Sequence, residues 1–147
     1  MSEPNVDPQM PQKVMVRKTY EAMWAEQMKA YRKANPAGTQ LKKYAVLNAL
    51  SLFEADLAHM RKHGTVIRGT LSHEPTVTAL NMAAKPPSAT VSDCADLSKW
   101  TTIKVKTGAV IPLPKGQPLR YRATATAERW DGRWVITTYK THGEQAC

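Results

Sequence analysis

Asp93 and Asp96 are the side chains whose type and spacing come closest to those of a catalytic pair. General acid–base catalysis needs two groups that converge on one substrate. Residues three apart in a regular strand point to opposite faces of the sheet, so these carboxylates converge only across a bulge or a turn. The run Asp96-Leu97-Ser98 is typical of a turn in which the aspartate accepts hydrogen bonds from nearby backbone N–H groups. We expect these aspartates to stabilise a turn through such hydrogen bonds rather than to take part in catalysis.

The histidines offer a second candidate chemistry, because His59 and His63 lie four residues apart on a stretch with helical periodicity. A metal site needs at least a third protein ligand, and no nearby carboxylate or cysteine clearly supplies one. His63 also suits a helix end, where the dipole favours a cation. His73, Glu74 and His142 receive no role. The sequence has neither a Gly-x-Ser-x-Gly elbow nor a glycine-rich phosphate loop. We therefore predict no catalytic residue, no metal and no cofactor.

Cys94 and Cys147 are the two cysteines of the chain. A bridge between them would close a loop of about 50 residues and contribute up to about 4 kcal/mol in the chain-entropy model. The spacing contains no Cys-x-x-Cys motif, which argues against exchange chemistry, and two isolated cysteines make a poor zinc site. We therefore expect Cys94 and Cys147 to form a structural disulfide. In the cytosol both cysteines would instead remain thiols.

Composition describes an ordinary folded chain with a basic surface. Its 147 residues suit one domain with a real core, and 42% are hydrophobic against 22% charged. The formal net charge of +9 arises from 21 Lys and Arg against 12 Asp and Glu, spread over both halves. This charge favours an anionic partner, such as an envelope polymer, a lipid surface or nucleic acid. The absence of a recognition motif argues against nucleic acid.

The first half of the chain is predicted to be helical. Large residues at spacings of three and four predict a helix that starts near Val16 and ends at Asn35-Pro36. A second helix is predicted from Thr39 to His63, because a basic last turn followed by glycine is a strong stop signal.

The second half of the chain is predicted to form β-strands. Residues 1–12 are polar and contain three prolines, so we expect them to form a flexible leader, with residues 13–147 as a single domain. Short β-branched or alternating runs predict strands over residues 65–68, 76–80, 89–92, 100–106, 119–128 and 134–141. Asp131-Gly132 predicts a two-residue hairpin turn between the last two. Helices followed by an antiparallel sheet predict an α+β fold, with the helices covering one sheet face.

Several segments together resemble a group of secreted or lipid-anchored bacterial proteins with a nuclear-transport-factor-2-like cone fold. The resemblance rests on residues 20–24, 43–45, 63–69, 75–78, 93–100 and 129–134. Its most specific part is the Asp-Cys-x-Asp-x-Ser-x-Trp run at 93–100, together with Cys147. The resemblance implies N-terminal helices in the concavity of a curved antiparallel sheet, a Cys94–Cys147 disulfide and export. It implies little about activity, because most such proteins have no assigned function.

A cone fold can hold an apolar pocket between its sheet and its helices. The candidate lining residues are aromatic: Tyr20, Trp24, Phe53, Trp100 and Tyr121. The alternative is that they fill the core, which the alanine face at 123, 125 and 127 favours, because small side chains let helices approach the sheet closely.

The leading functional expectation is a non-enzymatic accessory domain in the extracellular space or cell envelope. It would bind a protein partner or an anionic envelope component, and an export signal would have been removed from this sequence. The expected basic surface comprises Lys104, Lys106, Arg120 and Arg122. One alternative is a small-molecule carrier or isomerase-like enzyme that uses the cone pocket, and another is a cytosolic nucleic-acid-binding protein. The sequence leaves open a homodimer through the open sheet face.

Overall fold

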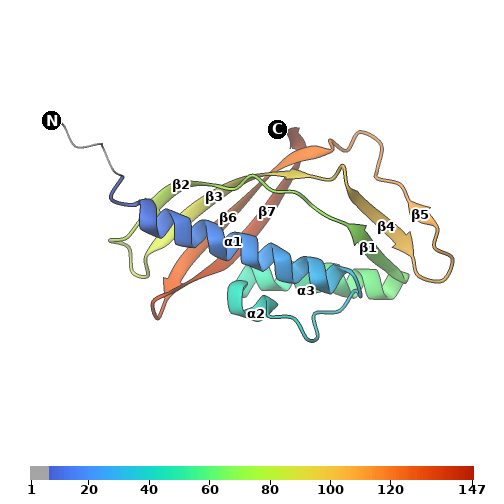
Figure 1. Ribbon diagram of the computed structural model, residues 1–147, viewed down its shortest axis with the longest axis horizontal. Helices are drawn as coiled ribbons and strands as arrows, with labels where there is room; N and C mark the ends of the chain where they lie inside the picture. Colours follow the sequence, from blue (N-terminus) through green and yellow to red (C-terminus); the bar gives the residue numbers. More distant parts are fainter. Residues whose placement is uncertain (1–6) are drawn as a thin grey trace.

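A computed structural model describes residues 7–147 of the chain, with the helices first and the strands after them. The three helices are α1 (Met10–Tyr31), α2 (Leu41–Tyr44) and α3 (Leu47–His63). The strands are β1 (Thr65–Gly69), β2 (Thr76–Asn81), β3 (Ser88–Asp96), β4 (Trp100–Lys104), β5 (Val110–Ile111), β6 (Arg120–Trp130) and β7 (Arg133–Ala146). Figure 1 shows this order along the chain, and it confirms the α+β class predicted from sequence.

Helix α1 begins earlier than its apolar stripe indicated. Residues 10–12, expected within the flexible leader, are helical. Pro11 suits this first turn because its missing N–H would have no partner there in any case. The side-chain amide oxygen of Gln12 accepts a 2.9 Å hydrogen bond from the Trp134 indole, so this turn is tied to β7. The remainder of the expected leader, residues 1–6, lies outside the described residues.

The single helix expected from Thr39 to His63 is two helices, which corrects the prediction. Ala45 is extended, with φ −116° and ψ 134°, and separates α2 from α3. It forms a parallel bridge with Ile136, and the N–H of Val46 donates a 2.9 Å bond to the Ile136 carbonyl. Docking on β7 therefore replaces helical hydrogen bonds at this point, although the apolar spacing continues through it.

The predicted end of α3 is confirmed. Gly64 follows the basic last turn and adopts a left-handed conformation with φ 64°, which glycine reaches without a steric penalty. The helix turns one apolar side into the core, through Ala49, Phe53, Leu57 and Met60.

The strands form two antiparallel sheets. The larger has the order β2-β3-β6-β7, and the smaller has the order β1-β4-β5. Strand β6 shows the alternation predicted for residues 119–128, since Tyr121 and the three alanines that follow it at every second position are buried. Asp131 and Gly132 both have positive φ, at 52° and 77°, as a two-residue turn between β6 and β7 requires.

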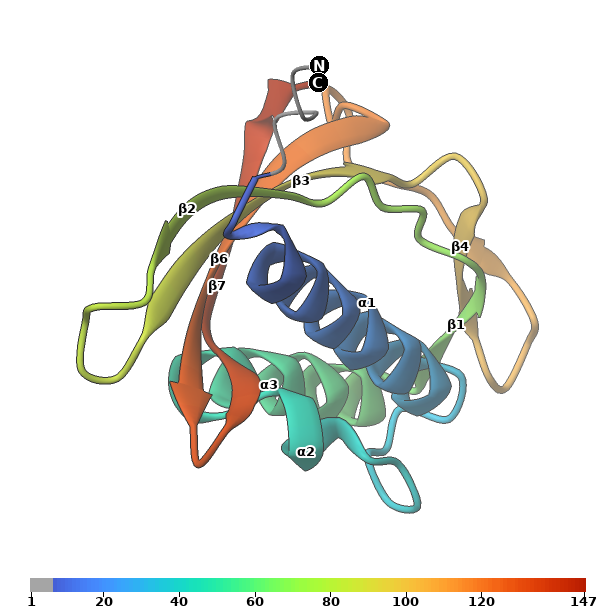
Figure 2. The same ribbon diagram turned by 60° about the vertical axis from the view of Figure 1, so that its left-hand side comes forward.

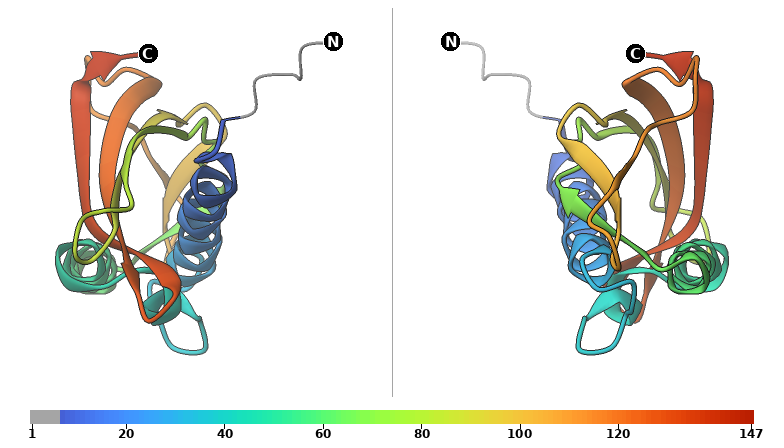
Figure 3. Two further views of the ribbon diagram at one scale, coloured as in Figure 1. Left: turned by 90° about the vertical axis from the view of Figure 1, so that its left-hand side faces the viewer. Right: turned by 90° about the vertical axis from the view of Figure 1, so that its right-hand side faces the viewer.

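The larger sheet curves around the helices, as expected for a cone fold. Figure 2 shows α1 inside the curve, with α3 across one end and the smaller sheet on the side opposite β2. Figure 3 views α3 end-on and shows it beside β7. Ala123, Ala125 and Ala127 are at most 3% exposed and face the core, so the larger sheet offers a shallow surface to the helices.

Candidate ligand pocket

A pocket of about 400 Å³ lies between α1, α3 and the strands, where the alanine face of β6 gives way to Tyr121. Its walls are predominantly aromatic, and every aromatic residue comes from a different place in the chain or a different helical turn. These residues are Trp24 and Tyr31 from α1, Phe53 from α3, Trp100 from β4, Tyr121 from β6 and Tyr139 from β7. Leu52, Leu71 and Leu97 complete the apolar part of the wall.

The aromatic wall is held by edge-to-face and tilted contacts. The ring centroid of Trp24 lies 5.1 Å from that of Phe53 and 5.5 Å from that of Tyr139. Tyr31 and Trp100 meet at 5.3 Å with an interplanar angle of 83°. Such contacts stabilise each pair by about 0.5–1.5 kcal/mol beyond the area that they bury. The aromatic side chains of the pocket wall therefore hold one another in position.

Four of the five predicted lining residues line this pocket, and Tyr20 does not. Tyr20 is fully buried and donates a 2.6 Å hydrogen bond to the Asp93 carboxylate. Sequence reasoning missed Tyr31 and Tyr139 as lining residues. Tyr31 lies seven residues after Trp24 on the same face of α1, so helical spacing could have found it.

Tyr31, Tyr121 and Tyr139 bring phenol side chains to the pocket wall. The hydroxyl of Tyr139 is buried and has no hydrogen-bond partner among the described residues. Burial raises the pKa of Tyr139 well above its ordinary value, and it raises the pKa of Tyr121 to about 12. Both phenols therefore stay protonated at neutral pH. A buried hydroxyl without a partner costs about 1–3 kcal/mol, which a bound polar group would relieve.

Asp56 supplies the carboxylate of the pocket. It lies on α3 and accepts a 3.0 Å hydrogen bond from the Tyr31 hydroxyl. Burial against the pocket wall raises the pKa of Asp56, while the bond from Tyr31 and the proximity of His59 oppose that rise. The site therefore disfavours this negative charge while the pocket is empty.

A second chamber of about 450 Å³ adjoins the first and shares three of its residues, Tyr31, Asp56 and Trp100. His59 and His63 line this chamber, with ring centroids 4.2 Å apart. Within residues 7–147, no three His, Cys, Asp or Glu side chains gather closely enough to hold a metal ion.

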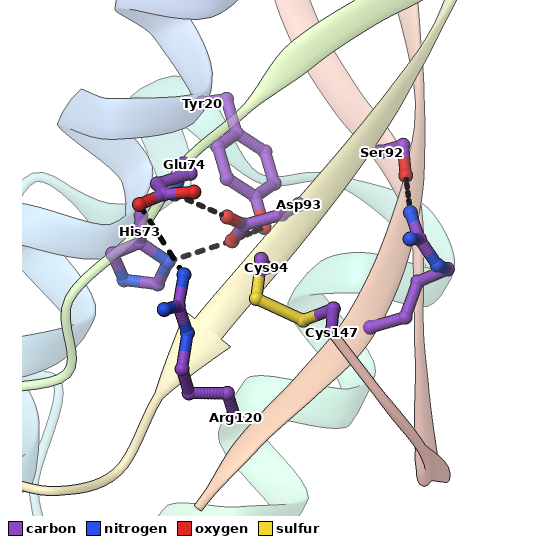
Figure 4. The surroundings of a disulfide bond; sticks show 9 residues. Tyr20, His73, Glu74, Ser92, Asp93, Cys94, Arg120 and Cys147 are labelled. Carbon is purple, nitrogen blue, oxygen red and sulfur yellow. Dashed lines mark hydrogen bonds and ion pairs between the residues drawn. A yellow bond between two sulfur atoms is a disulfide. The ribbon is translucent and has the colours of Figure 1, made fainter.

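Asp93 and Asp96 do not converge. Asp93 is 1% exposed and accepts three hydrogen bonds, from the Tyr20 hydroxyl, the His73 Nδ1 at 2.7 Å and the Glu74 N–H at 2.8 Å. Figure 4 shows these groups surrounding the carboxylate. The network joins α1, β3 and the segment before β2. Asp96 instead caps the turn after β3, where its Oδ1 accepts the Ser98 N–H at 2.9 Å.

Cys94 and Cys147 form a disulfide that joins β3 to the residue following β7, with a Cα–Cα distance of 5.9 Å. Figure 4 shows the bridge beside Arg120. The N–H of Cys147 donates to the Arg120 carbonyl at 3.3 Å, so the end of β7 is held twice. The bridge lies on the outward face of the larger sheet, since Cys94 pairs in register with Arg122.

The four predicted basic-surface residues come from both sheets. Arg120 and Arg122 lie on β6, Lys104 ends β4, and Lys106 is in the turn after it. Arg120 is 3.3 Å from the Glu74 carboxylate, and Arg122 donates a 2.6 Å bond to the Ser92 hydroxyl. The acidic neighbour Glu74 therefore offsets part of the positive charge on β6.

Comparison with known proteins adds information about the fold. No protein-family model and no curated protein sequence matches the chain. The structure is similar to the intermembrane space region of chloroplast protein ARC6, with a TM-score of 0.55 and 14% identity over 94% of this chain and 98% of that one. The chain has the expected cone fold. At this identity the similarity extends to the fold alone.

Two further solved structures match less closely. One is an NTF-2-like protein of unknown function from Shewanella oneidensis MR-1, with a TM-score of 0.41, 14% identity and coverage of 85% of this chain and 97% of that one. The other is Aln2 from a Streptomyces species, with a TM-score of 0.46, 17% identity and coverage of 95% and 94%. None of the helices described for the present chain is long and apolar enough to cross a membrane.

Proposed function

We propose that this domain binds a small, largely apolar molecule in the aromatic pocket and acts as a carrier or accessory protein. The observation that carries the proposal is the pocket itself, which measures about 400 Å³ and is lined by six aromatic side chains. Two of its lining residues, Trp24 and Tyr139, also carry buried polar atoms without a partner among the described residues. Native proteins rarely leave such atoms unsatisfied. The volume also falls in the range of small-molecule sites.

The competing expectation, that the aromatic residues fill the core, has direct support, because Trp24, Phe53 and Tyr121 are at most 8% exposed and belong to the buried core cluster. The same three residues also line the pocket. The proposed ligand would therefore lie against the surface of the packed core rather than replace part of it.

Carriage rather than catalysis is supported by the surroundings of two carboxylates, the buried Asp93 and the solvent-exposed Asp56. Asp93 is occupied by three donors and lies outside the pocket. Asp56 has two ionisable neighbours, the Tyr31 hydroxyl, which donates to it, and His59, which lines the second chamber with it. Burial raises the pKa of Tyr31 well above its ordinary value. Neither carboxylate is paired with a nucleophile in the described part of the chain.

An extracellular or envelope location belongs to the same proposal. The Cys94–Cys147 disulfide supports it, because such bridges persist in oxidising compartments and are rare in the cytosol. Binding of a protein partner or an anionic envelope polymer at the basic residues stays a prediction.

The pocket is tested with the neutral hydrophobic dye N-phenyl-1-naphthylamine, whose fluorescence rises in apolar surroundings. Trp100 lines both chambers, whereas Trp130 is an exposed residue of the β6–β7 hairpin. We expect Trp100→Ala to weaken dye binding at least fivefold and Trp130→Ala to leave it unchanged, with circular dichroism confirming that both variants fold. The proposal is wrong if the native protein does not bind the dye, or if the two variants bind it equally.

A further inference from the structure

The charge of the pocket is concentrated on one side chain. Among the described residues that line it, Asp56 is the one acid and Lys140 is the one base. The Asp56 Oδ2 accepts the Tyr31 hydroxyl at 3.0 Å, and Oδ1 has no hydrogen-bond partner in the described part of the chain. One oxygen of the carboxylate therefore remains available to a ligand.

Lys140 does not balance this charge inside the pocket. Side chains alternate along a strand, so Lys140 leaves β7 on the face opposite to Tyr139. The register agrees, because Lys140 pairs with Thr124 on the outward face, whereas Tyr139 pairs with the buried Ala125. Lys140 is exposed and reaches water without crossing the pocket.

The surrounding rings also favour positive charge. The face of an aromatic ring carries negative potential, and a cation within about 6 Å of the centroid gains about 0.5–2 kcal/mol. Tyr31 and Trp100 each line both chambers beside Asp56, so a group placed next to the carboxylate also lies against these rings. A neutral apolar ligand would use the rings and leave the carboxylate without a counter-charge. In the aromatic pocket an anion would meet repulsion from the rings and from Asp56, whereas Lys104 and the two histidines lie in the second chamber.

We infer that the pocket selects an organic cation, namely a protonated or quaternary amine on an apolar body, whose positive charge lies beside Asp56. This inference rests on the proposed ligand-binding function and specifies the class of ligand. A protonated amine would donate to Asp56 Oδ1, whereas a quaternary ammonium group would form an ion pair with it. In both cases the apolar body would lie along Trp24, Phe53 and Tyr139. A bound cation would also offset the cost of keeping Asp56 charged in its partly enclosed position.

Three probes that share one apolar body test this inference. They are 4-phenylbutylamine, which is a cation at neutral pH, 4-phenylbutan-1-ol, which is neutral, and 4-phenylbutanoate, which is an anion. Displacement of N-phenyl-1-naphthylamine gives each affinity. We expect the amine to bind about tenfold more tightly than the alcohol, and the anion to bind most weakly.

Two variants locate the charge that selects the amine. Asp56→Asn removes the charge and keeps an acceptor oxygen for Tyr31, while Glu54→Gln removes a charge from the same helix outside both chambers. We expect Asp56→Asn to reduce amine affinity about tenfold without changing alcohol affinity, and Glu54→Gln to change neither.

The outcomes separate this inference from the proposed function. Equal binding of alcohol and amine, tighter binding of the anion, or equal effects of Asp56→Asn and Glu54→Gln would each overturn the selection of a cation while leaving an apolar pocket. Failure of the native protein to bind the dye would overturn the pocket itself, and the selection of a cation with it.

Discussion

Removal of one hydroxyl from each of two buried tyrosines should have opposite effects on stability. Tyr20 and Tyr139 are at most 6% exposed, but the first hydroxyl donates to Asp93 at 2.6 Å and the second has no partner among the described residues. Tyr20→Phe leaves a fully buried carboxylate with two donors instead of three. A hydrogen bond to a charged group contributes about 1.5–3 kcal/mol. For a chain of this size, that loss lowers Tm by about 4–10 °C.

Tyr139→Phe removes a polar atom that folding takes out of water without compensation. We expect the free energy of unfolding to stay unchanged or to rise by about 1 kcal/mol, with Tm rising by at most about 4 °C. The same change should weaken binding of a ligand that carries an acceptor oxygen, such as 4-phenylbutan-1-ol, about fivefold to tenfold, because that ligand loses the hydrogen bond that this hydroxyl would donate. Stability and binding therefore move in different directions in this variant.

Differential scanning calorimetry of the native protein and the two variants measures Tm, and dye displacement by 4-phenylbutan-1-ol measures binding. Tyr20 does not line the pocket, so a correctly folded Tyr20→Phe protein should bind with affinity close to native. The reasoning is refuted if Tyr139→Phe loses as much stability as Tyr20→Phe. That result would mean that the Tyr139 hydroxyl is satisfied within the folded protein and marks no ligand site.

Three further predictions concern the bridge, the pocket carboxylate and the basic residues. Replacing both cysteines by alanine opens a bridge with a sequence separation of 53, which should lower the free energy of unfolding in calorimetry by about 4 kcal/mol. Carboxyl NMR titration should give Asp56 a pKa above its ordinary value, and Tyr31→Phe should raise that pKa further because it removes a bond to the ionised form. Since folded Asp56 holds its proton more tightly than unfolded Asp56, its contribution to stability should fall as pH rises from the unfolded pKa through the folded one. If the basic residues form the partner surface, recovery of envelope partners by affinity capture should be lost when glutamate replaces Lys104, Lys106, Arg120 and Arg122.

Local patterns predicted most of the fold because the information lies within a few residues. The stop of α3 needs a basic turn and Gly64, and the β6–β7 hairpin needs Asp131-Gly132. The break between α2 and α3 was missed for the opposite reason. Its cause is the Ile136 carbonyl on β7, about 90 residues later in the chain, which accepts the Val46 N–H. No local signal in the sequence at Ala45 and Val46 reveals that partner.

The candidate pocket was predictable in its aromatic character and not in its polar atoms. Helical spacing places Tyr20, Trp24 and Tyr31 on one inward face of α1, but it does not say which of them meets a carboxylate. That depends on which strand or helix lies opposite each turn. Asp93 of β3 meets Tyr20, and Asp56 of α3 meets Tyr31. A sequence without its topology therefore assigns all three aromatics to the same role.

The distribution of hydrogen bonds explains why binding capacity lies where it does. Asp93 receives three donors at a place where α1, β3 and the segment before β2 are tied together, and at 1% exposure its carboxylate is held by protein groups alone. Asp56 receives one donor beside a 400 Å³ pocket, in which Tyr139 offers a hydroxyl that the described protein groups do not use. Trp24 and Tyr139, which line this pocket, carry two of the four buried polar atoms without a partner among the described residues, while Gln27 and His73 carry the other two away from it. The proposed ligand is therefore placed where the pocket volume and two of these atoms coincide.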